Sequence, residues 1–338
     1  MFFKVKTTEE VLELVQGFQP VGEEIVRLDK ASGRVLNREI ISPEDLPGFP
    51  RTSVDGYAIK AKDSFGATES LPALLEIVGE VGMGQIPSAT VSAGQAVKIS
   101  TGGMVPTGAD GVVMVEYCHL LDQTTVEVSR AISPQENVIQ ADDDFKKGAP
   151  VLRKGWRLRS QDVGVLAGLG VTKVTAYRKP RVAIISTGDE VIPVDQKPRP
   201  GQVRDINSYT LSAFCAEQGA EPVPLGLCRD NFDQLRDALL KGLETADTVW
   251  ISGGSSVGTR DLTLKVFESI EGTELLVHGI SISPGKPTII ARSGTRMVIG
   301  LPGHVASTLV VAEVFMTRLI ARLSGYAGLP RSWGAEVE

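Results

Sequence analysis

The spacing of hydrophobic and polar positions differs between two parts of the chain, and it changes after Lys179. From Arg181 onward, short apolar runs typical of buried strands are separated by longer segments whose apolar residues recur at helical spacing. Strands followed by helices at this spacing predict a parallel, doubly wound α/β sheet with right-handed crossovers. The expected strands are 182–186, 223–227, 248–252, 288–291 and 297–301, and the expected helices are 208–218, 232–245, 262–269 and 305–323.

The first half of the chain has a different pattern of apolar runs and turn residues. Between Leu46 and Val128, short β-favouring runs alternate with Gly and Pro turns, which predicts a small all-β module. Helical patterns at 7–15 and 157–169 flank this module, so we expect it to be inserted into a discontinuous helical linker domain. The predicted fold is therefore a multidomain α/β protein, with linker domain 1–45 and 146–178, inserted β domain 46–145 and α/β domain 179–326.

Composition narrows the classes of function. The net charge of −6 disfavours a protein that binds nucleic acid through its whole surface. No apolar run is long enough to span a membrane, and the first residues lack the features of a signal peptide. The three cysteines form no CxxC pair, which argues against a disulfide framework or a cysteine-based zinc site. We therefore expect a cytoplasmic protein.

Acidic and glycine-rich turns follow three successive predicted strands. They are Thr187-Gly188-Asp189-Glu190, then Arg229-Asp230, and then Gly253-Gly254-Ser255-Ser256-Val257-Gly258 with Asp261 shortly afterwards. Ligands of such sheets bind outside the carboxyl ends of the strands, so these turns are expected to share one site. Glycine turns that lead into helices suit phosphate, and oxygen-only ligands beside phosphate favour Mg²⁺. Lys286, in a Pro-Gly-Lys-Pro turn, offers a positive charge for an anionic substrate.

Each of these features also has a plainer interpretation when it is taken alone. Asp230 and Asp261 are suited to capping the helices that follow them. The glycine-rich run from Gly253 to Gly258 is compatible with a simple tight turn, and Asp189-Glu190 and Lys286 with solvated surface positions. The recurrence of acids and glycines at three strand ends is what favours a functional site.

Six separated motifs in this order resemble the molybdopterin molybdenumtransferases, the MoeA family, which includes the C-terminal part of gephyrin. The motifs are SVDGYA (53–58), TGGMVPTGAD (101–110), STGDE (186–190), SGGSSVG (252–258) with Asp261, PGKP (284–287) and LPG (301–303). The resemblance covers nearly the whole chain. It implies that the discontinuous linker domain is also the dimerisation domain and that a small β-barrel ends the fold, with residues 327–338 resembling its start.

The resemblance also implies a reaction. Members of this family take adenylylated molybdopterin, cleave off AMP with Mg²⁺ and transfer molybdate to the dithiolene. The resemblance implies an elongated homodimer, in which the site is a cleft between the α/β domain of one subunit and the inserted β domain of the other. The implied partners are therefore these small-molecule substrates, a second copy of the chain and a molybdopterin adenylyltransferase.

Site residues carry over from the matching motifs. Asp55 and Thr101 are expected to face the cleft from the β domain. Glu190, Asp230 and Asp261 are the expected carboxylates around the metal and the phosphates, and Lys286 is expected to hold the anionic substrate. The remaining substrate contacts implied by the motifs are Ser186, Thr187, Gly188, Asp205, Gly253, Gly254, Ser255, Gly258, Pro302 and Gly303.

Several positions depart from the family pattern, so several positive charges expected to contact molybdate or the pterin phosphate are missing. Basic residues usual before the PGKP motif are replaced in the stretch from Gly279 to Ser283, and Ile139 stands where an Arg is common. The family's GED motif reads Asp142-Asp143-Asp144, and His304-Val305 stands where Asn-Pro is usual. Alternative functions therefore stay open: a non-catalytic cofactor-binding or carrier protein, a tungstate-specific transferase, or an enzyme that adenylylates molybdopterin.

Overall fold

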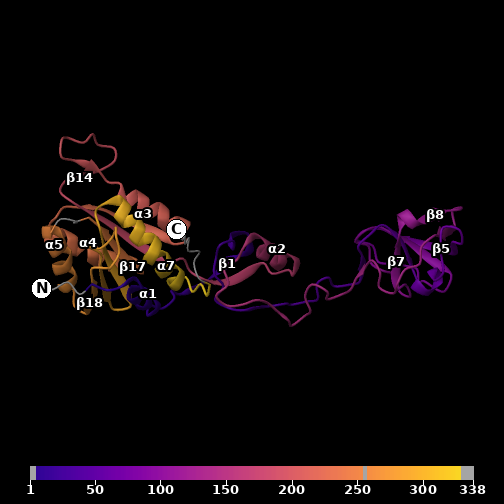
Figure 1. Ribbon diagram of the computed structural model, residues 1–338. Helices are drawn as coiled ribbons and strands as arrows, with labels where there is room; N and C mark the ends of the chain where they lie inside the picture. The colour runs from indigo at the N-terminus through magenta and orange to yellow at the C-terminus, as the bar shows by residue number, and fades with distance from the viewer. Residues whose placement is uncertain (1–4, 254–256, 329–338) are drawn as a thin grey trace. The chain divides into compact units, whose positions relative to one another are not determined.

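The computed structural model describes residues 5–253 and 257–328, without the side chains of 257–261. The chain forms two compact units (Figure 1). The main unit comprises Met1–Glu39 and Leu152–Glu338, and the inserted unit comprises Ile40–Val151. Gly254, Ser255 and residues 329–338 of the expected barrel start at 327–338 lie outside the described residues. No helix among the described residues is long and apolar enough to cross a membrane.

A six-stranded sheet forms the centre of the main unit, with strand order β16-β13-β17-β20-β19-β18. The first four of these strands are parallel neighbours. Their bounds are β13 (Arg181–Thr187), β16 (Glu221–Cys228), β17 (Thr248–Ser252), β18 (Thr273–His278), β19 (Ile289–Ser293) and β20 (Arg296–Leu301). All five residues of β17 are buried, as expected for a central strand that is covered on both faces.

Helices cover both faces of this sheet, which gives the predicted doubly wound α/β architecture. One core contains Val182 and Trp250 of the sheet together with Phe214 and Phe315 of the helices, and the other contains Ile185 together with Leu239. The helices are α3 (Asn207–Glu217), α4 (Phe232–Thr245), α5 (Val257–Glu268), α6 (Val305–Val311) and α7 (Thr317–Leu323), with a π-helical turn at Ala312–Met316. The first core also takes in Val11, Val15 and Phe18, so the N-terminal helix α1 (Thr8–Gln16) packs with the α/β elements.

The expectation of a fully parallel sheet is wrong at one edge. β18 has no counterpart among the predicted strands, and it pairs antiparallel with β19, which pairs antiparallel with β20. The connections among these three strands are too short for a crossover helix, so the chain returns along the sheet instead of crossing over it.

The rest of the main unit surrounds this sheet with small elements. β1 (Glu23–Arg27) and β12 (Lys173–Tyr177) form an antiparallel pair near α2 (Ser160–Gly168). Between β13 and α3, β14 (Val191–Ile192) and β15 (Val203–Arg204) form a short parallel pair.

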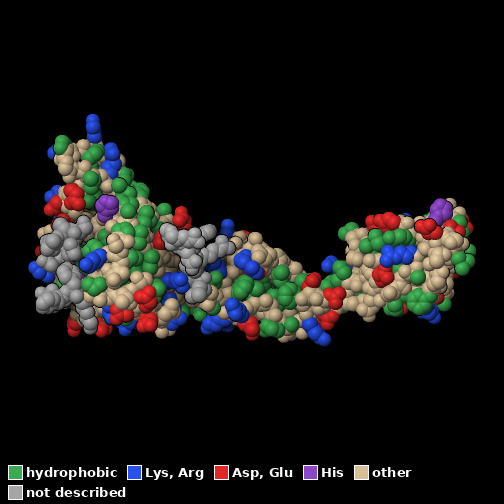
Figure 2. All heavy atoms as spheres, viewed as in Figure 1, with side chains coloured by type: hydrophobic (Ala, Val, Ile, Leu, Met, Phe, Trp, Pro, Cys, Tyr) green, Lys and Arg blue, Asp and Glu red, His purple; other side chains and the backbone are tan. Residues whose placement is uncertain are grey.

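The inserted unit is all-β, as the sequence predicts, and has its own core. Its six-stranded sheet has the order β7-β4-β6-β5-β9-β8 and buries Tyr57, Ile59 and Val113. The sheet strands are β4 (Gly56–Ile59), β5 (Ala73–Val81), β6 (Gln95–Ile99), β7 (Gly111–Met114), β8 (Cys118–Leu120) and β9 (Thr125–Val128), and the short strands are β2 (Ile40–Ile41), β3 (Arg51–Thr52), β10 (Val138–Ile139) and β11 (Pro150–Leu152). Figure 2 shows hydrophobic, acidic and basic side chains interspersed on the visible face of both units.

Candidate active site

A pocket of about 400 Å³ lies at the carboxyl ends of β13 and β17. The chain runs from β13 to β16 on one side and later returns to β17 on the other side, so these two strands flank the point where the strand order reverses. Such a reversal leaves a crevice above the sheet. Six of the predicted site residues line the pocket: Ser186, Thr187, Glu190, Asp205, Gly253 and Gly303.

A buried hydrogen-bond network lies at the floor of this pocket. The Ser186 Oγ donates to Asp205 Oδ1 over 2.9 Å and lies 2.8 Å from the Ser208 Oγ and 3.2 Å from the Ser252 Oγ. Asp205 Oδ1 also accepts from the backbone N–H of Ser208 in the first turn of α3, which fixes its carboxylate. Asp205 is only 7% exposed and lines the pocket with its Oδ1 held by these donors, so its carboxylate is fixed in orientation.

Thr187 connects the pocket to the second predicted carboxylate. Its Oγ1 donates to Asp230 Oδ1 over 2.7 Å, and the Asp230 N–H donates to Asp189 Oδ1 over 3.3 Å. The alternative that Asp230 caps α4 is wrong, because Asn231 occupies that position and accepts from the Gln234 N–H. The half-buried Asp230 carboxylate is therefore not committed to the helix end.

Two of the predicted glycines lie where the backbone approaches other atoms closely. A Cβ on Gly253, whose φ is +132°, would lie 2.0 Å from the carbonyl oxygen of Thr187, so no larger residue fits here. A Cβ on Gly188, whose φ is +149°, would lie 2.9 Å from Glu190 Oε2. The turn after β17 is thus packed tightly against the end of β13, whereas the contact at Gly188 involves the end of the exposed Glu190 side chain.

The other predicted residues of the main unit lie around this pocket or outside the described side chains. Lys286 is exposed in the turn between β18 and β19, and Pro302 accepts a hydrogen bond from Thr308 Oγ1 through its carbonyl. Neither residue lines the pocket. Gly258 lies in the first turn of α5, and Asp261 lies in the same helix with a side chain outside the described set.

Four polar residues of the pocket wall, one of them Ser252 at the end of β17, were not among the predicted site residues. Arg204 and Asn207 flank the predicted Asp205, and His304 precedes α6. Asn207 Nδ2 donates to the Gly303 carbonyl over 2.9 Å, which ties the start of α3 to the turn after β20. The signal available in the sequence was their adjacency to predicted site residues, since neighbours of a strand-end residue reach the same crevice.

The two site residues predicted in the inserted unit lie together. Asp55 Oδ1 accepts from the Thr101 backbone N–H over 2.7 Å and from Thr101 Oγ1 over 3.1 Å. These two hydrogen bonds, the backbone one first, lower the pKa of Asp55. An exposed carboxylate is thereby held ionised and oriented, as an electrostatic or metal-binding role requires.

The donor set of the pocket is compatible with a hard divalent cation. Glu190 is exposed at the pocket, and Asp230, which accepts from Thr187 at Oδ1, has a second carboxylate oxygen to offer. Among the described side chains no group of three or more acidic, histidine or cysteine residues is close enough to hold a metal ion. The third predicted ligand, Asp261, lies outside that set, so the three-carboxylate site stays a prediction.

Two family models match the chain and together cover most of it. Residues 6–170 match the MoeA N-terminal region (domain I and II), and residues 183–322 match a probable molybdopterin binding domain. The second match contains the pocket and the whole sheet of the main unit.

Individual relatives agree with these models. A molybdopterin molybdenumtransferase of Nostoc sp. is 35% identical over 307 residues, covering 90% of this chain and 70% of the relative, and one of Haemophilus influenzae is 34% identical, covering 90% and 74%. A crystal structure of a molybdopterin biosynthesis MoeA protein from Pyrococcus horikoshii OT3 is 32% identical with a TM-score of 0.83, covering 95% of this chain and 80% of that one. With two family models and relatives matched over nine-tenths of this chain in agreement, the chain belongs to the MoeA family of molybdopterin molybdenumtransferases.

Proposed function

We propose that this chain inserts molybdate into adenylylated molybdopterin in an Mg²⁺-dependent step that releases AMP. Its family makes it a transferase of molybdenum cofactor biosynthesis. The observation that carries the finer proposal is the pocket at the ends of β13 and β17, where five residues of three separate motifs and the predicted Asp205 line one cavity. A cavity of this size suits a small organic substrate.

The protein contributes mainly positioning and charge neutralisation to this reaction, because cleavage of a phosphoanhydride needs little covalent catalysis by side chains. Glu190 and Asp230, with Asp261, are the carboxylates that would hold Mg²⁺. Bound Mg²⁺ would neutralise phosphate charge and polarise the phosphate oxygens. Thr187 keeps the Asp230 carboxylate oriented through its 2.7 Å hydrogen bond.

Cationic groups of the chain would hold the anionic substrate. Lys286 is exposed in the turn between β18 and β19, and Arg204 lines the pocket with its Nε bonded to the Gln196 carbonyl at 3.0 Å. This bond uses one of the five N–H groups of the guanidinium, so the others are available to phosphate oxygens. Arg204 thus supplies positive charge at the pocket of a chain that lacks several basic residues expected for its family.

Replacing one pocket carboxylate by its amide tests the proposal. Glu190→Gln should lower the kcat/KM for AMP release from adenylylated molybdopterin with molybdate by about 100-fold, because a carboxylate that neutralises charge in the transition state is lost. The matched control is Asp195→Asn, an exposed acid in the segment between β14 and β15 that does not line the pocket. Full turnover by Glu190→Gln, or an equal loss in the control, contradicts the proposed site.

The proposal includes a homodimer, in which the Asp55–Thr101 pair of one copy serves the pocket of the other, as the family resemblance implies. Asp55→Ala and Glu190→Gln should each be inactive alone. Mixed after joint refolding, they should regain roughly a quarter of wild-type AMP release, because half of the dimers are mixed and each of these has one intact site. No recovery in a mixture that is shown to exchange subunits would rule out a shared site.

A second candidate is a carrier that binds the cofactor without chemistry. Ile139 and His304, which stand where the family usually has Arg and Asn, favour it, and His304 lies in the pocket wall. Calorimetry with adenylylated molybdopterin distinguishes the two functions. Tight binding with no AMP formed at any molybdate concentration selects the carrier, whereas molybdate-dependent AMP formation selects the transferase.

A further inference from the structure

A second pocket, of about 270 Å³, lies in the main unit at the opposite end of the sheet from the candidate active site. It is bounded by the turn 32–35, by Arg157, by the segment 177–179 that leads into β13 and by the end of α3 at 216–219. These segments lie near the starts of β13 and β16, so this cavity is separate from the one at the strand ends. We call it the basic pocket, because four of its lining residues are Arg34, Arg157, Arg178 and Lys179.

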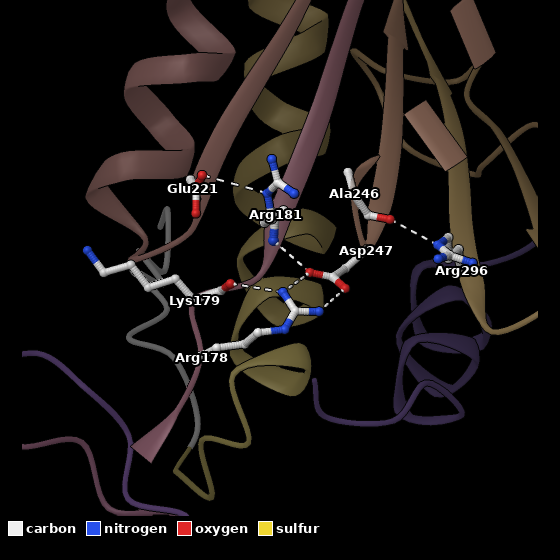
Figure 3. A network of polar contacts seen from close by, with 7 residues as sticks. All are labelled: Arg178, Lys179, Arg181, Glu221, Ala246, Asp247 and Arg296. Atoms are coloured by element: carbon white, nitrogen blue, oxygen red, sulfur yellow. Dashed lines mark hydrogen bonds and ion pairs between the residues drawn. The ribbon is translucent and has the colours of Figure 1, made fainter. Parts of the chain in front are cut away.

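Two of these four cations are committed to protein partners. Arg178 forms a fork with Asp247, its Nη1 donating to Oδ2 over 2.7 Å, and Asp247 Oδ2 also accepts from the Arg181 N–H over 2.8 Å (Figure 3). Arg34 pairs with Glu24 and donates to the Tyr177 carbonyl over 2.8 Å. These pairs fix the walls of the basic pocket and neutralise their own charges.

The other two cations have no carboxylate partner among the described residues. The guanidinium of Arg157 stacks on the ring of Tyr326 at 4.6 Å, and its Nε is buried without an acceptor. Figure 3 shows the Lys179 side chain extending away from the Arg178–Asp247 pair, and Lys179 makes no ion pair within the described part of the chain. Leaving an N–H group of a half-buried arginine without an acceptor costs free energy. An anion bound in the cavity beside it would supply the missing acceptor.

The remaining wall does not cancel this excess of positive charge. Glu217 is the one carboxylate in the lining, and its side chain belongs to an exposed residue that is free to turn to solvent. Three carbonyls near the end of α3, those of Phe214, Cys215 and Ala216, are already occupied, because they accept from the N–H groups of Gln218, Ala220 and Gly219. Two uncommitted cations therefore face one cavity.

We infer that the basic pocket binds the phosphate group of a small molecule, either the free ion or a monoester, through Arg157 and Lys179. A phosphate carries close to two negative charges at neutral pH, which match two unpaired cations, and its oxygens accept the N–H groups of a guanidinium in pairs. The room left around the anion accommodates the small organic group of a monoester. This site is additional to the proposed substrate site and does not depend on it.

Site-resolved nuclear magnetic resonance tests this assignment at constant ionic strength. Inorganic phosphate and glycerol phosphate are titrated in turn, with the backbone amides of Gly33 and Gly219 as reporters of the basic pocket and that of Gly253 as the reporter of the active site. Saturable shifts of Gly33 and Gly219 are expected, with tighter binding of glycerol phosphate if a monoester is the ligand. Shifts that chloride reproduces at the same ionic strength would overturn the inference.

Variants make the test specific. Arg157→Gln should weaken phosphate binding at Gly33 and Gly219 by at least tenfold, and Lys179→Gln by about threefold. Lys179 is exposed, so its replacement leaves folding intact even where loss of the Arg157 stacking does not. Lys265→Gln in α5 removes the same charge elsewhere and should leave the binding unchanged. Equal binding by all three variants contradicts the assignment.

Discussion

At the scale of single residues, the candidate site depends on backbone groups that approach more closely than a side chain allows. The carbonyl of Thr187 occupies the place that a Cβ on Gly253 would need, at 2.0 Å. The same threonine orients Asp230 through its hydroxyl. The glycine therefore does more than turn the chain after β17, since it lets the ends of two neighbouring strands meet and brings their polar groups to one pocket.

Gly253→Ala should destabilise the main unit by about 3 kcal/mol or more, because the alanine is strained at a φ of +132° and collides with a backbone atom that cannot move alone. Urea denaturation followed by circular dichroism measures the loss. Gly272→Ala is the matched control, because this glycine also has a positive φ, +74°, but has open space around it. The control should cost only about 1 kcal/mol, and similar losses in both variants would show that the close contact is not decisive.

Residue types at strand ends were predictable from the sequence, but their individual partners were not. The rule that ligands bind beyond the strands predicts Thr187 and Glu190, whereas Ser186 is implied only by the family resemblance. It gave no way to decide between Asp230 and Asn231 as the cap of α4, because both residue types cap helices equally well and stand side by side. The structure resolves that choice, because the Asn231 side chain accepts from the Gln234 N–H.

At the scale of elements, α2 shows how one carboxylate organises a helix start. Asp162, 5% exposed, accepts from the Arg159 N–H over 2.8 Å, from Arg159 Nε over 3.0 Å and from Trp156 Nε1 over 2.9 Å. The Arg159 side chain is the largest of the influences that hold the pKa of Asp162 at about 2. Asp162 thus joins the segment before α2 to the first turn of the helix.

Asp162→Asn should lower the free energy of unfolding at pH 7 by about 1–2 kcal/mol, because the ion pair between Arg159 and the carboxylate is lost. The folded pKa of about 2 lies below the ordinary value of 3.8, so the stabilisation is present above pH 4 and is lost as the pH falls toward 2. Thermal unfolding of both proteins between pH 7 and pH 2.5 measures it. A difference that is independent of pH over this range would contradict the ionic origin.

Elements with a strong periodic pattern were predicted well, and the edge of the sheet was not. β17 was predicted with its observed bounds, and α4 likewise, because a buried run and an amphipathic helix each have a clear period. β18 was missed since it lies at the sheet edge, where its residues are only partly buried and its pattern is weak. The helix expected at 305–323 is continuous but contains a π-helical turn, which the spacing of apolar residues does not reveal.

At the scale of the whole molecule, two units with separate cores share one chain. No described core cluster combines residues of the main unit with residues of the inserted unit. The sequence indicates this division, because short β runs separated by close turns in one part and strands alternating with helices in the other are not expected in one sheet. Cooperativity requires shared buried contacts, so the two units should unfold as separate transitions.

Scanning calorimetry of two single variants of the intact chain, one substituted in each unit, tests this expectation. A Cβ on Gly56 in β4 would lie 1.8 Å from the Val113 carbonyl oxygen, and one on Gly253 lies 2.0 Å from that of Thr187. Gly56→Ala should lower the transition of the inserted unit by about 10 °C and shift the other by less than about 2 °C, with the reverse for Gly253→Ala. If either variant lowers both transitions together, the units are coupled through contacts that their separate cores do not contain.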